Sequence, residues 1–238
     1  MNSGMYAALS GNLSAMRRLE VISNNLANAS TPGFKGDQIQ FESVLAAVNN
    51  PTQVTPVFSN EQFSTDFTQG SLQKSDNVLD LALDGDGFFV VNTPQGPAYT
   101  RQGNFHRGAG GRLVNGDGYE LQGKNGPISV AGGRIEIGAA GVVTVDGVAS
   151  GTLAQVDFPK PYQLAKAGGG LFVPSNPQTA TTPSAAEVKQ GYLESSNVKV
   201  IVEMARMIEA SRYFESCAKA VKSYDDMTAK AANELGKV

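Results

Sequence analysis

The chain has 238 residues, enough for one large domain or two small ones with a buried core. Only 17% of the residues are charged and 27 are glycine, a weakly charged, turn-rich composition that carries a net charge of −3. This balance supplies no cationic surface, so we expect no nucleic-acid partner. No apolar run is long enough to cross a membrane, and the first residues lack the pattern of a cleaved signal peptide.

The first 36 residues predict a helix that ends in a turn. Its apolar side chains recur every 3.5 residues on average, which is typical of a helix that packs on another helix: Met5, Leu9, Leu13, Met16, Leu19, Ile22 and Leu26. Pro32 disfavours a helical conformation at Thr31. We expect a positive φ angle at Gly33, so that the turn sets the direction in which the chain leaves the helix. An ordinary negative φ is the alternative.

The centre of the chain has a different pattern. Residues 37–77 are polar and predict an extended linker, ordered only where its phenylalanines find a surface. Residues 78–186 predict an antiparallel β domain, because short apolar segments alternate with Gly-, Asn- and Asp-rich turns. The expected strands are Leu79–Leu83, Phe88–Val91, Tyr119–Gln122, Ile128–Val130, Arg134–Ile137, Val142–Val145 and Leu153–Phe158.

The last division of the chain, residues 187–238, contains a second predicted long helix. We expect it to begin after Ser195, Ser196 and Asn197, which are all favourable N-cap residues. An apolar stripe with the same 3.5-residue mean runs from Val200 to Leu235. The predicted fold is therefore α+β, with paired N- and C-terminal coiled-coil-like helices and a central antiparallel β domain. Burial along one face only marginally offsets the cost of ordering such a helix. We therefore expect the helices to pair and also to contact neighbouring subunits, with an ordinary intramolecular helix pair as the alternative.

The chain offers little chemistry. His106 is the only histidine and lies in a polar loop, and Cys217 falls on the helix stripe, so neither a catalytic triad nor a metal site is expected. The Asp84–Asp86 pair resembles the start of a calcium loop, but the later ligand positions are wrong. Only a carboxylate pair for sugar hydrolysis stays open, from Asp80, Asp84, Asp86 and Glu120. We predict no catalytic residue, no metal and no cofactor.

Three blocks of the sequence resemble the bacterial flagellar rod and hook protein family. The first is Ser23–Asn28 followed by Thr31–Lys35, the second runs through Leu79–Leu83 and Gly85–Val91 to Phe105, and the third is Leu193–Glu215. The blocks occur in the family's order and span most of the chain. Its short length and its opening residues most resemble the proximal rod type of this family, labelled F.

The resemblance implies a noncatalytic axial subunit of the basal-body rod, assembled helically into a torque-transmitting shaft. It implies export from the cytoplasm by the flagellar type III apparatus without a cleaved signal peptide, a periplasmic location, and contacts with further copies and with proximal and distal rod proteins. No small-molecule substrate is implied. We predict that the turn uses Pro32, Gly33 and Phe34, and that the assembly interface comprises Leu9, Leu13, Met16, Leu19, Ile22, Asn24, Asn25, Leu26, Asn28, Val200, Met204, Met207, Ile208, Phe214, Val221 and Leu235.

Three alternatives remain open from the sequence. The chain could be a distal rod or hook-type subunit of the same family. It could be a peptidoglycan-cleaving enzyme needed for passage through the cell wall, or a secreted β-rich adhesin or capping protein, which would not need paired terminal helices.

Overall fold

The structure, a computed structural model, describes residues 3–43 and 59–235. The chain divides into two compact units. The helical unit takes its residues from Met1–Ala27, Asp37–Asp66 and Lys199–Val238, and the β unit from Asn28–Gly36 and Phe67–Val198. The predicted α+β fold is confirmed, with one helix at each end of the chain and antiparallel strands between them.

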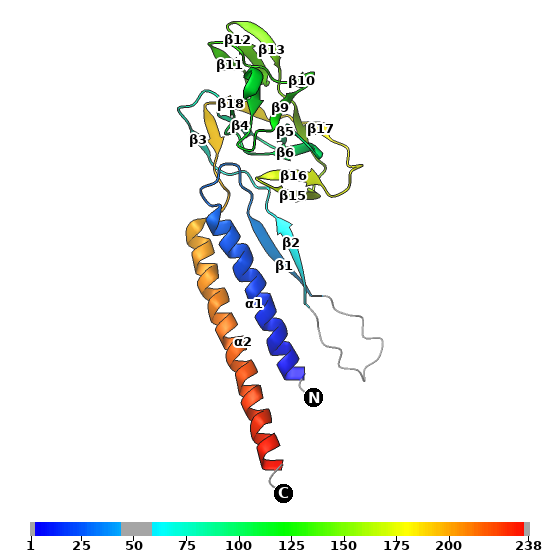
Figure 1. Ribbon diagram of the computed structural model, residues 1–238, viewed down its shortest axis with the longest axis vertical. Coiled ribbons are helices and arrows are strands. Elements are labelled where there is room, and N and C mark those ends of the chain that lie inside the picture. Colours follow the sequence, from blue (N-terminus) through cyan, green and yellow to red (C-terminus); the bar gives the residue numbers. More distant parts are fainter. Residues whose placement is uncertain (1–2, 44–58, 236–238) are drawn as a thin grey trace. The chain divides into compact units, whose positions relative to one another are not determined.

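The helical unit contains two helices and a hairpin. Helix α1 spans Ser3–Ala27 and helix α2 spans Val200–Leu235. They pack side by side with opposite directions, and α2 continues beyond the start of α1 (Figure 1). Strands β1 (Asp37–Ser43) and β2 (Ser59–Thr65) pair antiparallel, and β1 contacts α1.

The residues that follow α1 explain why the helix ends at Ala27. The helix stops at Ala27, and the next turn closes with a hydrogen bond from the Thr31 N–H to the Asn28 carbonyl at 3.1 Å. The Thr31 hydroxyl also donates to the Asn28 side chain at 3.2 Å. Pro32 has no N–H with which to continue the helix.

Antiparallel strands and one short 3-10 helix (η1, Ala109–Gly111) form the β unit. Its largest sheet has the strand order β15 (Leu164–Gly168), β16 (Leu171–Pro174), β6 (Gly96–Thr100), β5 (Phe88–Thr93), β9 (Glu120–Gly123), β8 (Leu113–Val114) and β7 (His106–Arg107). Three further strands join this sheet. Strand β10 (Gly126–Pro127) pairs with β9, and β14 (Gln155–Asp157) pairs with both β5 and β17 (Thr182–Pro183). A three-stranded sheet contains β11 (Ile135–Ile137), β12 (Val142–Val145) and β13 (Val148–Thr152).

Two further strand pairs join distant parts of the chain within the β unit. Strand β4 (Leu81–Asp84) pairs with β18 (Glu187–Gln190), and β3 (Leu72–Lys74) pairs with β19 (Tyr192–Glu194). The last strands before α2 therefore belong to the same folded unit as the strands that follow residue 66.

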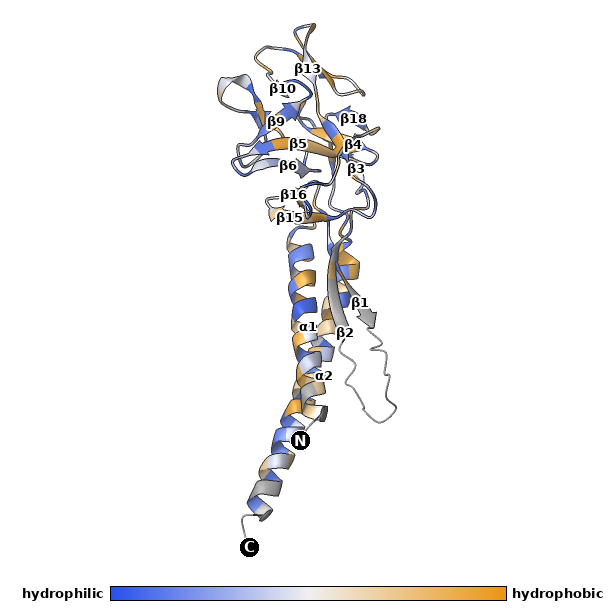
Figure 2. Cartoon of the chain, turned by 90° about the vertical axis from the view of Figure 1, so that its right-hand side faces the viewer, coloured by the Kyte–Doolittle hydropathy of each residue, from blue (hydrophilic) through white to orange (hydrophobic). Residues whose placement is uncertain are grey.

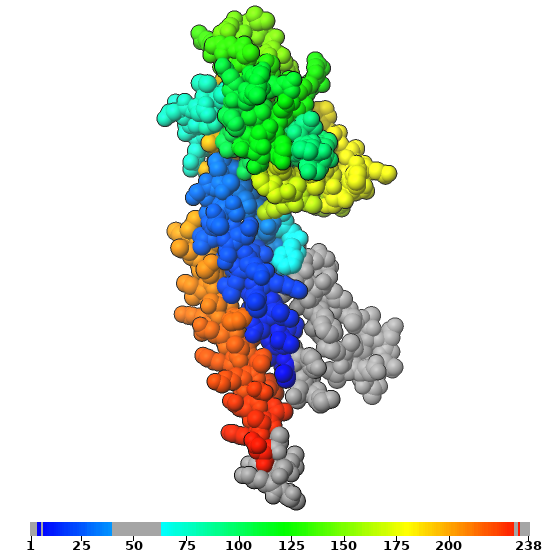
Figure 3. All heavy atoms as spheres, in the orientation of Figure 1, coloured from blue at the N-terminus to red at the C-terminus, as the bar shows by residue number. Residues whose placement is uncertain are grey.

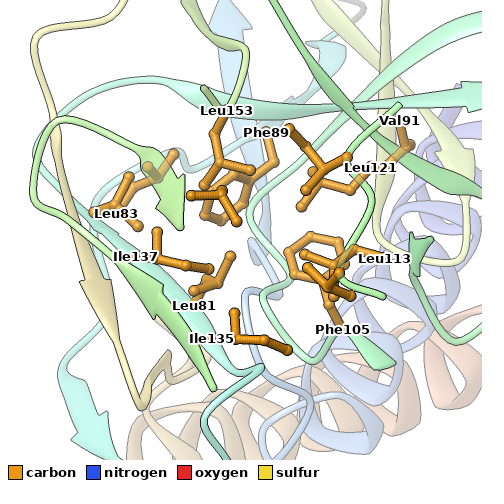
Figure 4. Packing of buried hydrophobic residues seen from close by; sticks show 14 of the residues in the cluster. Leu81, Leu83, Phe89, Val91, Phe105, Leu113, Leu121, Ile135, Ile137 and Leu153 are labelled. Atoms are coloured by element: carbon orange, nitrogen blue, oxygen red, sulfur yellow. The ribbon is translucent and has the colours of Figure 1, made fainter. Parts of the chain in front are cut away.

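The core of the β unit is apolar and closely packed (Figure 4). Its fully buried side chains come from several strands and converge, among them Leu81, Phe89, Phe105, Leu121 and Leu153. A second, aromatic cluster forms around Phe88, where the ring of Phe67 stands edge-on at 5.9 Å between centroids. Phe67 of the expected linker therefore packs against the aromatic cluster of the β unit, whereas Phe63 is exposed. The linker residues 44–58 lie outside the described part of the chain.

Most of the expected strands are present, and the differences have local causes. The segment Ile128–Val130 is not a strand; only Ser129 bridges to Arg112, because the neighbouring N–H groups bond to two different segments. The expected strand Leu79–Leu83 is present as β4 from Leu81, and Asp80 to Leu83 are all buried. The turn at Asp146 and Gly147 joins β12 to β13, with φ angles of 51° and 83° that suit a two-residue hairpin.

The compact units differ from the divisions that we expected at residues 36, 77 and 186. Residues 28–36 group with the β unit, and the expected linker contains the β1–β2 hairpin of the helical unit. Residues 187–194, which we placed in one division with the second helix, form strands β18 and β19, whereas α2 begins at Val200, after the predicted N-cap residues. Residues 187–194 form strands because their backbone pairs with β3 and β4, a nonlocal effect that local propensity does not predict.

We predict that the amide hydrogens of α1 and α2 exchange faster than those of β4, β5 and β9 in dilute protein. Buried apolar side chains in the described helical unit are Ala15, Ile22 and Ala210, a small set for so much ordered helix. Hydrogen–deuterium exchange with mass spectrometry measures this difference. Equal protection in the two units would show that the helix pair is stable without partners.

Candidate assembly site

Small residues make the contact of α1 with α2. A Cβ added at Gly11 would stand 3.0 Å from both the Cys217 Sγ and the Tyr213 hydroxyl, and one at Gly4 would overlap the ring of Tyr224. Ala15, which lies on the same face of α1, is completely buried. The two helix backbones therefore approach closely along this line, without large side chains between them. The Cys217 sulfur, and then burial, raise the pKa of the Tyr213 phenol.

The N-terminal half of the predicted α1 stripe lies outside this contact. Met5 is 38% exposed, Leu9 46%, Leu13 51% and Met16 46%. Met5 and Met16 are one position, about 100°, from Gly4 and Ala15, and Leu9 and Leu13 are two positions, about 160°, from Gly11. Nearer the end of α1, Ile22 is buried and Leu19 and Leu26 are half-buried.

The predicted interface residues of α2 divide in the same way. Met207, Phe214 and Val221 are half-buried, whereas Val200, Met204 and Ile208 are exposed. The side chain of Leu235 lies outside the described residues. In Figure 2, hydrophobic residues recur along the ribbons of both helices.

Three of these apolar side chains line an open hollow between the helices. Met16 and Leu19 line it from α1 and Phe214 from α2, with Glu20, Ser23 and Asn24 at its polar edge. Figure 3 shows α1 lying against α2, which continues beyond the start of α1. We define the assembly face as Met5, Leu9, Leu13, Met16 and Leu19 of α1 with Met204, Ile208 and Phe214 of α2.

The polar residues that end α1 have separate roles. Asn25 is buried, and its side-chain amide donates to the Asp37 carbonyl at 2.8 Å while its oxygen accepts the Asp37 N–H at 2.9 Å. This pair of hydrogen bonds attaches β1 to α1. Asn28 accepts the bond from Thr31 described above, and Asn24 is exposed.

A buried charge cluster lies in the β unit, between the segment after α1 and the segment before α2. The Lys35 ammonium contacts Glu194 Oε1 at 2.5 Å, and Arg101 Nη1 contacts Glu194 Oε2 at 3.3 Å. The side chains of Lys35 and Glu194 are completely buried and that of Arg101 is 3% exposed. We call these three residues the Glu194 cluster.

Further hydrogen bonds satisfy most of the polar atoms of the Glu194 cluster, although the buried Arg101 Nε has no hydrogen-bond partner among the described residues. Lys35 donates to the Thr68 carbonyl at 2.7 Å, Arg101 Nη2 donates to the Gly85 carbonyl at 2.8 Å, and the Gly70 N–H donates to Glu194 Oε1 at 2.9 Å. The Arg101 guanidinium also lies 5.4 Å from the centroid of the Phe88 ring. Burying charges is tolerated only with such partners.

Backbone contacts bring the same two segments together. The Gly33 N–H donates to the Glu194 carbonyl at 2.7 Å, and the Gly36 N–H donates to the Asn197 side chain at 2.8 Å. The chain therefore enters and leaves the β unit through one fastened junction. The sequence blocks contained Lys35, Arg101 and Glu194, but only the fold shows that they meet.

The turn at Gly33 has the predicted positive φ angle, 67°. A Cβ at this position would stand 2.5 Å from the backbone of Arg101 and Gln102, so there is no room for a side chain. Pro32 and Phe34 are half-buried, and the Lys166 ammonium lies 4.6 Å from the centroid of the Phe34 ring. The alternative of an ordinary negative φ is excluded.

The carboxylates considered for sugar hydrolysis interact with different partners. Asp80 accepts hydrogen bonds from Ser75 and Asn77, Asp86 pairs with Lys160, and Glu120 pairs with Arg112. Across residues 3–43 and 59–235, no group of three or more His, Cys, Asp or Glu side chains is arranged to hold a metal ion. No helix in this part of the chain is long and apolar enough to cross a membrane.

Comparison with known proteins agrees with this architecture. Three family models match: "Flagella basal body rod protein" over residues 5–35, "Flagellar hook protein FlgE/F/G D1 domain" over 82–145, and "Flagellar basal body rod FlgEFG protein C-terminal" over 189–235. The chain is 33% identical to the flagellar basal-body rod protein FlgF of Rhizobium meliloti, with 99% of each chain covered.

Other relatives extend the likeness. Identity is 32% to FlgF of Caulobacter vibrioides, with 100% of both chains covered, and 31% to the rod protein FlgG of Bacillus subtilis, with 98% of this chain and 99% of the relative covered. The fold and these matches define a structural protein of the flagellar basal body, not an enzyme. The chain belongs to the flagellar basal-body rod protein family and is similar to its FlgF type.

We predict that Glu194→Gln lowers the free energy of unfolding of the β unit by about 3–5 kcal/mol, because it leaves two buried cations without their carboxylate. Glu136→Gln is the matched control, since the Arg134–Glu136 pair is largely exposed and is expected to contribute less than about 1 kcal/mol. Denaturant titration followed by tyrosine fluorescence measures both. Similar losses in the two variants would contradict the role of burial.

A second prediction concerns Gly33. Gly33→Ala is expected to destabilise the β unit by about 2 kcal/mol or more, through strain at positive φ and overlap with the Arg101 backbone. Gly116→Ala is the control, because that glycine has no neighbour within 4 Å of an added Cβ. Thermal unfolding compares the variants, and an unchanged midpoint for Gly33→Ala would rule out a tight junction.

Proposed function

We propose that this chain is an axial subunit of the proximal rod, and that its helical unit assembles with further copies and with other rod proteins. The observation that carries the proposal is the assembly face. Small residues join α1 to α2, while larger apolar side chains remain exposed outside this contact. Large exposed apolar side chains in this number are typical of a protein–protein interface.

The energetics of the helix pair support assembly. The contact through Gly4, Gly11 and Ala15 buries little apolar area for the backbone that is ordered. A second contact would bury Leu13, Met16 and Ile208 without repeating that ordering cost. Helices that pair within the chain and also contact neighbours therefore account for both the small-residue contact and the exposed stripe.

The role in the flagellum follows from the family. Helical assembly into a torque-transmitting shaft, contact with proximal and distal rod proteins, a periplasmic position and export through the flagellar type III apparatus all belong to this proposal. The Glu194 cluster suits such a part, because it fastens within the β unit the segments that continue into α1 and α2. The FlgF-type relatives favour a proximal position over a distal one. No observation favours a peptidoglycan-cleaving enzyme.

We predict that Met16→Asp and Ile208→Asp block incorporation into basal bodies and abolish swimming. Both side chains are about half exposed, so the monomer tolerates a carboxylate, whereas an interface would have to bury it at a cost of several kcal/mol. Swimming halos in a deletion strain and immunoblots of isolated basal bodies report the outcome.

Ala7→Asp is the matched control for this experiment. Ala7 is an exposed residue of α1 about 120–180° around the helix from Leu9, Leu13 and Met16, and the substitution introduces the same charge. Normal swimming is expected for this variant. If Met16→Asp and Ile208→Asp also swim normally, the assembly face is misassigned; if the wild-type chain is absent from basal bodies, the proposed function itself fails.

A further inference from the structure

A second concave surface lies within the helical unit, between α1, α2 and the start of β1. This pocket has a volume of about 380 Å³. Its apolar lining includes Ile22 and Ala210, which are buried, and the half-buried Val21. Its charged lining consists of the guanidinium groups of Arg18 and Arg206 and the carboxylates of Asp37, Glu203 and Glu209. The negative groups are therefore in excess.

Glu203 supplies an unsatisfied acceptor in the wall of this pocket. Its side chain is 7% exposed, and Oε1 accepts a hydrogen bond from Arg206 Nη1 at 2.7 Å. Its other oxygen, Oε2, is buried and has no hydrogen-bond partner among the described residues. A buried carboxylate oxygen without a donor is unfavourable, so the site gains stability when a donor is brought in.

The pocket and the assembly face share no residue. On α1, Val21 of the pocket is five positions from Met16 of the assembly face, which is about 140° around the helix. On α2, Glu209 and Phe214 have the same separation. One subunit therefore offers two unlike surfaces. Contacts between unlike surfaces repeat from subunit to subunit and generate rings or helical filaments, whereas a self-complementary surface stops at a dimer.

We propose that this pocket binds a lysine or arginine side chain from a second copy of the chain. The apolar lining suits the aliphatic stem of such a side chain, and the carboxylates suit its charged end. A single positive charge would balance the excess negative charge of the pocket. The inference rests on the proposed function, because it assumes that copies meet in the rod, and it specifies what one contact recognises.

The chain itself carries suitable donors. Arg212, Lys219, Lys222 and Lys230 are exposed residues of α2. At about 100° per residue, all four fall on the face of α2 that is turned away from the contact with α1, where a neighbour can reach them. We therefore expect the donor to be one of these four side chains.

A charge-reversal experiment tests the proposal. Glu209 is exposed on the pocket rim, so Glu209→Lys leaves the fold intact but repels an incoming cation. We expect at least about tenfold less of this variant in isolated basal bodies, measured by quantitative immunoblot. Asp225→Lys, an exposed charge reversal on the same helix that is outside the pocket and about 120–140° around the helix from Arg212, Lys219 and Lys230, is the control and is expected to incorporate within about twofold of wild type.

A second set of variants identifies the donor. In the Glu209→Lys background, Arg212, Lys219, Lys222 and Lys230 are each changed to glutamate, and restored incorporation by one of them supports the proposal. Normal incorporation of Glu209→Lys, or a loss that none of the four changes restores, overturns it. Circular dichroism of each purified variant verifies the helix content. Absence of the wild-type chain from basal bodies would instead refute the proposed function, and with it the contact between copies.

Discussion

The burial of the Glu194 carboxylate is the constraint on which the rest of the β unit depends. Its two oxygens contact cations from positions 159 and 93 residues away along the chain, so the charge is tolerated only when three distant segments are in place together. Removing one partner would leave an uncompensated ion in an apolar interior. Such an interaction adds little net stability compared with an apolar core, but it permits only one arrangement of the segments that enter and leave the unit.

The helical unit has the opposite character. Its internal contact relies on glycine and alanine, which let the backbones approach but bury little apolar area. Larger apolar side chains are exposed outside this contact, and a charged pocket lies between α1, α2 and β1. In the proposed function, these two unlike surfaces make repeated contacts with neighbouring subunits. The contrast between the closely packed β unit and the sparsely packed helix pair supports the proposed role as an axial subunit.

Much of this organisation was predictable because it depends on local patterns. The 3.5-residue spacing identified both helices, and the Pro32–Gly33 turn and the Asp146–Gly147 hairpin depend on backbone preferences of single residues. Motifs dense in Ser, Asn, Pro and Gly identified the family, and the matches over nearly the whole chain agree. The failures have nonlocal causes: Ile128–Val130 bonds to two segments, and 187–194 became strands by pairing with β3 and β4.

The sequence by itself determined the number and ends of the helices, the antiparallel β class and the conformation of Gly33, because each follows from the properties of neighbouring residues. Tertiary structure alone decided which face of each helix is used. A stripe of Met and Leu predicts an apolar surface, but whether its partner lies in the same chain depends on how closely the helices approach, and that distance is set by Gly4 and Gly11 against Tyr224 and Cys217. It also decided that Lys35, Arg101 and Glu194 meet, since attraction between charges far apart in sequence acts only after the core has brought them together.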